Sequence, residues 1–180
     1  MVSLQDFKAS LKLLRGSMRV ILSLTDQAKC LGAYAQDVVD AIVETIDSQT
    51  QSDDKMPGLY LLDSIAKSVG QPFTEIIQSR VSDVFCRIFM QAKKDIRVLL
   101  HTTRLSWSQH FPSEVLIPLD IRVRAMDPAW PDFKVTKVAG QGMSLPTPSS
   151  SSSHWHNSFV SKRHRGESPA PPSKRCRREH

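Results

Sequence analysis

The stretch Met56–Phe73, MPGLYLLDSIAKSVGQPF, most limits the possible folds, because it predicts a helix that needs packing partners. Pro57 suits a first helical turn, and Gly70 followed by Pro72 predicts a firm end. An apolar stripe at helical spacing runs between these signals and consists of Leu59, Leu62, Ile65, Ala66 and Val69. A helix of this kind is stable only when other segments cover the stripe.

Six further segments repeat apolar residues at spacings of three and four, and none shows the alternation of a strand. Ser3 and Asp6 match a capping box at the first of them, and Gly16 predicts its end. Gln49–Asp54 reads as a polar loop. The helices are predicted at residues 3–15, 17–29, 33–48, 73–91, 94–110 and 113–124. The pattern favours an all-α bundle or a small superhelix of paired helices.

The C-terminal part of the chain has a different composition. Residues 1–140 hold 17 Lys/Arg and 16 Asp/Glu, whereas residues 141–180 hold 7 and 2 and are rich in Ser and Pro. We therefore expect a helical domain at 1–131 and a disordered basic tail at 132–180. Within the tail, Trp155, Phe159 and Val160 are the apolar residues that could form a short docking segment.

Two basic clusters in the tail are separated by eight residues and fit a bipartite nuclear import signal. The residues predicted to form it are Lys162, Arg163, Arg165, Lys174, Arg175, Arg177 and Arg178. The alternative is a basic tail that contacts RNA or DNA phosphates without specificity. Both interpretations predict a nuclear protein. Ser168-Pro169, between the clusters, is a candidate phosphorylation site.

Catalytic motifs are missing from the sequence. It has no Gly-rich phosphate loop, nucleophile elbow or His-Glu-x-x-His pattern, so we predict neither enzyme activity nor a cofactor. His154 and His156 lack a second ligand cluster, and no metal site is expected. Three scattered cysteines favour an intracellular compartment, and no segment approaches a membrane span of about 20 apolar residues.

The central helix also carries polar residues beside its apolar stripe: Tyr60, Asp63, Ser64, Lys67 and Ser68. A second polar stripe, Arg97, His101 and Arg104, is predicted on the outer face of the helix at 94–110. These could be two solvated faces. Alternatively, a carboxylate and a guanidinium flank a groove that takes an extended peptide carrying hydroxyls and phosphate.

Residues 55–71, KMPGLYLLDSIAKSVGQ, resemble the signature helix of the CTD-interaction domain (CID) family, which binds the heptad-repeat tail of RNA polymerase II. The segments 97–108, RVLLHTTRLSWS, and 119–131, LDIRVRAMDPAWP, are similar in order and spacing, so the resemblance covers roughly residues 3–131. It implies a right-handed superhelix of seven or eight helices, architecturally like VHS and ENTH domains. It also implies the nucleus, mRNA 3′-end processing, cleavage and polyadenylation, and transcription termination.

In that family the repeat Tyr-Ser-Pro-Thr-Ser-Pro-Ser lies in a groove between the second, fourth and seventh helices. Asp63 matches the aspartate that accepts hydrogen bonds at the peptide tyrosine. Arg104 matches an arginine placed to meet phosphate on the second serine. The neighbouring groove or support positions correspond to Tyr60, Ser64, Ile65, Lys67 and Ser68. The implied partners are the polymerase tail and the cleavage and polyadenylation machinery, with RNA as a further partner and no membrane.

Two departures from the family pattern concern the groove. Ser68 stands where the family usually has Asn, and residues 15–25 match the second helix only loosely. One alternative is therefore a degenerate groove, with RNA bound through the tail. Another is a VHS- or ENTH-like adaptor, for which Lys8, Lys12 and Arg15 offer a mild basic surface.

Overall fold

The structure is a computed structural model that describes residues 2–131. The described part is all-α, with seven α-helices, one 3₁₀ turn and no strand. The elements are α1 (Leu4–Leu11), α2 (Met18–Lys29), η1 (Gly32–Tyr34), α3 (Ala35–Ser48), α4 (Ser52–Ser68), α5 (Phe73–Gln91), α6 (Lys94–Trp107) and α7 (Ser113–Met126). The predicted all-α class and the number of helices are confirmed.

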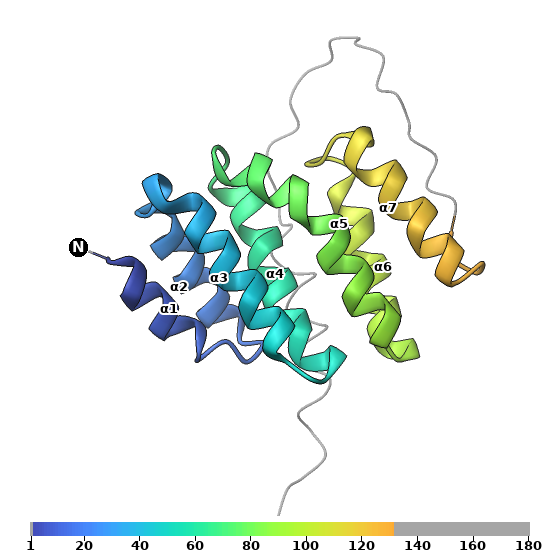
Figure 1. Ribbon diagram of the computed structural model, residues 1–180, viewed down its shortest axis with the longest axis horizontal. Coiled ribbons are helices and arrows are strands. Elements are labelled where there is room, and N and C mark those ends of the chain that lie inside the picture. The colour runs from blue at the N-terminus through green and yellow to red at the C-terminus, as the bar shows by residue number, and fades with distance from the viewer. Residues whose placement is uncertain (1, 132–180) are drawn as a thin grey trace, which may run out of the picture. The chain divides into compact units, whose positions relative to one another are not determined.

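The helices form two rows. In Figure 1, α3, α5 and α7 cross the side turned to the viewer, and α2, α4 and α6 lie behind them. Helices of the front row contact their neighbours, α3 with α5 and α5 with α7, while α4 packs against α2, α3 and α5. The α4 helix thus occupies the centre of the domain.

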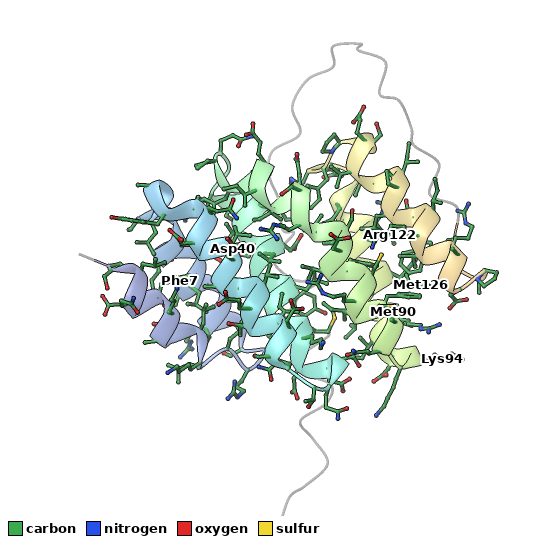
Figure 2. All side chains as sticks on the ribbon, viewed as in Figure 1. Phe7, Asp40, Met90, Lys94, Arg122 and Met126 are labelled. Atoms are coloured by element: carbon green, nitrogen blue, oxygen red, sulfur yellow. The ribbon has the colours of Figure 1, made fainter. Side chains whose placement is uncertain are left out.

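Ion pairs join the helices of the front row along its exposed side. Arg80 Nη2 lies 3.1 Å from Asp40 Oδ1 and connects α5 to α3. Arg122 Nη1 lies 2.7 Å from Asp83 Oδ1 and connects α7 to α5. Figure 2 labels Asp40 on α3 and Arg122 on α7. Pairs as exposed as these contribute about 0–1 kcal/mol each, so core packing dominates the stability of the row.

The α4 helix is buried on more sides than the sequence predicts. Leu59, Leu62 and Ile65 are buried as expected, but Leu61 on another side is also completely buried. Gly58 makes the closest approach to a neighbouring helix, because a Cβ built there would lie 2.3 Å from Cγ1 of Ile46 on α3. Contact at this distance is possible only without a side chain at position 58.

Several predicted helix ends differ from the structure. The capping box of Ser3 and Asp6 is present, but α1 ends at Leu11 rather than Arg15. The α4 helix begins at Ser52, inside the predicted polar loop, so Pro57 lies within the helix rather than in its first turn. The predicted stop is confirmed by Gly70, whose φ of 82° is a left-handed conformation.

Candidate functional site

Asp63 is the centre of a buried polar cluster between α4 and α6. Asp63 is 2% exposed, and its Oδ1 accepts a 2.7 Å hydrogen bond from Trp107 Nε1. Lys67, one turn further along α4, donates to Oδ2 at 2.8 Å. Burial raises the pKa of Asp63, and the charge and hydrogen bond of Lys67 act against that rise. The carboxylate is therefore fixed by two donors from two helices.

Lys67 connects this cluster to the surface. Its side chain is 20% exposed, compared with 1% for the side chain of Asp63. Nζ also donates to Ser106 Oγ at 2.9 Å, which links α4 to α6 a second time. Lys67 is therefore the most accessible side chain among Asp63, Lys67 and Trp107.

Tyr60 lies on the inner side of the same cluster. It is 5% exposed and forms a hydrogen bond with Thr103 of α6. The Thr103 hydroxyl also donates to Leu99 O at 2.9 Å, so Thr103 connects Tyr60 to the backbone of α6. Burial raises the pKa of Tyr60, and the nearby charge of Asp63 raises it further. Tyr60 therefore supports α6 and offers a ligand little surface.

Ser64 ties the other side of α4 to α2. Its hydroxyl lies 2.8 Å from Thr25 Oγ1, and Thr25 donates to Ile21 O at 2.9 Å, so Ser64 is the donor between the two side chains. Thr25 is buried, whereas Ser64 is half-buried. Leu22, three residues before Thr25, is 53% exposed. The α2 side of α4 thus offers a hydroxyl and an exposed apolar side chain.

The surface between α2 and α6 carries the accessible groups of the site. Ser68 is exposed on α4, while Leu99, Thr102 and Ser106 are half-buried on α6 at helical spacing. Ile65, predicted to be a groove or support residue, is completely buried and belongs to the core. We call the surface formed by Leu22, Ser64, Lys67, Ser68, Thr102 and Ser106 the α4 surface.

Arg104 does not lie on an exposed stripe, and that part of the sequence prediction is wrong. It is 1% exposed, its Nε donates to Asp120 Oδ1 at 2.9 Å, and its Nη2 donates to Asp120 Oδ2. Trp130 Nε1 donates to the same Oδ1 at 3.2 Å. The guanidinium is therefore engaged by α7 and the DPAWP segment.

The other two residues of the predicted stripe, Arg97 and His101, contact the segment that follows α7. Arg97 pairs with Asp127 at 2.6 Å and lies over the Phe89 ring, 4.5 Å from its centroid. His101 meets Trp130 edge-to-face, with ring centroids 5.6 Å apart. The stripe holds the chain after α7 instead of forming a groove wall.

The sequence analysis did not assign four residues that complete the clusters around Asp63 and Arg104. They are Thr25, Thr103, Ser106 and Asp120. Threonine and serine within amphipathic helices give no distinct signal, because their partners are distant in sequence: the Thr25–Ser64 and Lys67–Ser106 contacts each span 39 residues. Asp120, by contrast, falls among buried apolar positions of α7. A charged residue at such a position indicates a buried partner.

A separate cavity of about 410 Å³ lies between α1 and α3. Lys8, Lys12 and Arg15 line it together with Glu44 and the residues that end α3. Cations near helix C-termini complement the helix dipole, which accounts for their presence without a ligand. The cavity therefore adds little to the adaptor alternative.

No group of three potential metal ligands occurs among residues 2–131, and no helix in that range is long and apolar enough to cross a membrane. The predicted import signal, the Trp155–Val160 segment and the two tail histidines lie outside the described residues.

No protein-family model matches the chain. It is 26% identical over 132 residues to polyadenylation and cleavage factor homolog 11 of Caenorhabditis elegans, covering 71% of this chain and 16% of the relative. It is 30% identical over 113 residues to an uncharacterized protein of Schizosaccharomyces pombe, covering 63% of this chain and 18% of the relative. The chain thus spans less than a fifth of the length of either relative.

Among solved structures, a crystal structure of the RPR of Pcf11 matches with a TM-score of 0.60 and 25% identity. The match covers 68% of this chain and 95% of that structure. The helical rows and the polar cluster on α4 define an all-α superhelical domain of the kind found in that structure. These matches in sequence and fold support a CTD-interaction (RPR) family domain in this chain.

Proposed function

We propose that this domain binds the heptad-repeat tail of RNA polymerase II through the α4 surface and acts in nuclear mRNA 3′-end processing and termination. The observation that carries the proposal is the polar cluster of Asp63, Lys67 and Trp107. In this cluster, Asp63 of α4, the predicted signature helix, accepts hydrogen bonds from Lys67 of α4 and Trp107 of α6. The similarity to a polyadenylation and cleavage factor supports the same process. The cleavage and polyadenylation machinery is the expected wider partner.

The accessible groups suit an extended peptide rich in serine and proline. Ser64, Ser68, Thr102 and Ser106 offer hydroxyls, and Leu22 offers an apolar contact on α2. Lys67 can meet a peptide hydroxyl or phosphate, since its side chain is partly exposed. A phosphate preference would come from this ammonium group, because the guanidinium of Arg104 is buried against Asp120.

Affinity for a single repeat should be micromolar or weaker, about −8 kcal/mol, with multiple repeats adding avidity. The test is fluorescence anisotropy with a two-repeat peptide, unmodified or phosphorylated on the second serine. Asp63→Asn should weaken binding about tenfold, because it removes the charge that holds Lys67. Asp83→Asn on α5 is the matched control and should leave binding unchanged.

Ser68→Asn provides a test in the opposite direction. Asparagine offers a donor and an acceptor on a longer side chain at this exposed position of α4, so binding should tighten a few-fold. Lack of binding by the wild type and this variant would instead favour the degenerate groove. RNA binding through the tail would then be examined with a chain lacking residues 141–180.

A further inference from the structure

His110 lies at the end of the α4 surface, one helical turn beyond Ser106. Thr102 and Ser106 are four residues apart on α6, and His110 follows Ser106 by another four, so the exposed imidazole continues the line of the two hydroxyls. The backbone N–H of His110 donates to Trp107 O at 2.9 Å, which continues the helical turn beyond α6. Ser106 Oγ accepts a 2.9 Å hydrogen bond from Lys67, so the imidazole lies one turn from that ammonium group.

The turn that carries His110 is held against the polar cluster. Phe111 is 5% exposed, and its ring meets the Trp107 indole edge-to-face with centroids 5.3 Å apart. The Phe111 N–H also donates to Trp107 O at 2.9 Å, and the same indole donates to Asp63. His110 is therefore positioned by an anchored neighbour and by a residue of the cluster itself.

Two charged groups of α4 act on the imidazole of His110. Partial burial lowers the pKa of His110 below its usual 6.5, the positive charge of Lys67 lowers it further, and the Asp63 carboxylate acts in the opposite direction. The adjacent residues Gln109 and Phe111 carry no charge. The imidazole of His110 is therefore mainly neutral at pH 7 when no ligand is bound.

A phosphate bound beside Lys67 changes this balance, because a dianion favours the charged form of a nearby imidazole. We propose that His110 and Lys67 together bind the phosphate of a phosphorylated polymerase-tail repeat and that His110 takes up a proton as the phosphate binds. The proton comes from solvent, and the charged imidazole donates an N–H to a phosphate oxygen. The inference rests on the proposed function and adds regulation by pH to it.

Proton uptake on binding fixes the direction of the pH dependence. Affinity for the phosphopeptide must rise as pH falls, until the phosphate itself becomes protonated near its second pKa of about 6. Uptake of one full proton would change affinity about tenfold per pH unit, and partial uptake between pH 8.0 and pH 6.5 should give roughly threefold. The unmodified peptide should show no such increase, and it also reports any titration of Asp63.

The test is fluorescence anisotropy of the full chain with the two-repeat peptide, phosphorylated on the second serine or unmodified, at pH 8.0 and pH 6.5. His110→Gln should remove the increase and leave phosphopeptide affinity at pH 8.0 within about twofold of wild type. His110→Lys places a permanent positive charge here, so it should bind the phosphopeptide more tightly than wild type at pH 8.0 and show no increase.

His101→Gln is the matched control, because it removes an imidazole that packs against Trp130 outside the α4 surface. This variant should keep the wild-type pH dependence. A second readout is the NMR signal of the His110 imidazole, whose pKa should rise when the phosphopeptide is added and stay unchanged with the unmodified peptide.

The outcomes separate this inference from the function on which it rests. If His110 only supports the turn, His110→Gln weakens binding equally at both pH values, and the proposal is wrong. An equal pH dependence for the two peptides also overturns it, since the titrating group then does not act on the phosphate. Binding without pH dependence overturns the role of His110 alone, whereas no binding of either peptide overturns the proposed function as well.

Discussion

Asp63 is a carboxylate removed from water and held by an indole and an ammonium group. Burial favours its neutral form, so its pKa in the folded protein is above the 3.8 of a free side chain. Lys67 and Trp107 oppose this effect by stabilising the charged form. The site therefore holds a charge that costs folding free energy, and a peptide donor reaching it would find a strong acceptor.

The raised pKa gives Asp63 an unusual effect on stability. Between pH 3.8 and the higher pKa of the folded state, the folded protein binds more protons than the unfolded chain, so stability falls as pH rises. Asp63→Asn has no such titration. The free energy of unfolding of wild type minus that of Asp63→Asn should therefore decrease from pH 3.5 upward, as measured by urea denaturation; an increase would contradict the assignment.

Arg104 and Asp120 form a buried ion pair whose partners depend on each other. Arg104→Ala leaves the Asp120 carboxylate, which is 7% exposed, without its guanidinium. We expect a loss of about 3–5 kcal/mol in the free energy of unfolding by chemical denaturation. Arg122→Ala, which removes an exposed pair with Asp83, is the control and should cost under about 1 kcal/mol.

Removing both partners of the buried pair distinguishes pairing from packing. Arg104→Met with Asp120→Leu replaces the charges by apolar groups, and stability should recover most of the loss seen in Arg104→Ala. A double variant as unstable as the single one would show that the shape of the guanidinium, rather than its charge, is required. Peptide affinity measured on the folded double variant should equal that of wild type.

The predicted exposed stripe on α6 differs from the structure for one reason. Arg97, His101 and Arg104 obey helical spacing, and a charged stripe on an isolated helix is usually solvated. Their partners, Asp120, Asp127 and Trp130, follow 16 or more residues later, so only the packing of α7 and the segment after it reveals that the stripe is paired and that Arg104 is buried. Helical spacing places Asp63 beside Lys67 on the polar side of α4, and only the family resemblance predicts its role at the peptide tyrosine.

Among the helices, the contact between α3 and α4 depends on one glycine. Gly58→Ala improves intrinsic helix propensity by about 1 kcal/mol, but the new Cβ would lie 2.3 Å from Ile46 Cγ1. The helices must separate, and we expect a net loss of about 1–3 kcal/mol in thermal or chemical unfolding. Gly32→Ala, which meets nothing within 4 Å, is the control and should be close to neutral.

A compensating substitution tests the same contact. Ile46→Ala removes the Cγ1 and Cδ1 atoms that the new side chain would meet. In the Ile46→Ala background, Gly58→Ala should be neutral or stabilising, giving a clear coupling in a double-mutant cycle. Additive losses would place the strain elsewhere in α4.

Helix ends were predicted well where a stop residue acts locally. Phe73–Gln91 has its predicted bounds, since Gly70 and Pro72 precede it and apolar spacing persists through the helix. The start of α4 was predicted too late, because Ser52, Asp53 and Asp54 are typical of loops as well as of first helical turns. Composition alone cannot distinguish these two uses of acidic residues.

For the whole molecule, the segment after α7 completes the domain. Trp130 is 6% exposed and contacts Phe85, Phe89 and His101, while Arg124 Nη2 donates to Pro131 O at 3.2 Å. We infer that the domain boundary lies near Pro131.

A truncation tests this boundary. The free energy of unfolding of a chain ending at Met126 should be about 3–5 kcal/mol lower than that of a chain ending at Pro131, a loss comparable to deleting a buried tryptophan. Equal stability would move the boundary to the end of α7.

The central claim is that the α4 surface binds the polymerase tail, and backbone and side-chain NMR shifts test it most directly. On titration with the phosphorylated two-repeat peptide, the amides of Ser64, Lys67 and Ser68, those of Thr102 and Ser106, and the Trp107 indole N–H should shift together. Residues of the basic cavity, such as Lys12 and Thr45, should not move. Shifts confined to that cavity, or no shifts at millimolar peptide, would contradict the account.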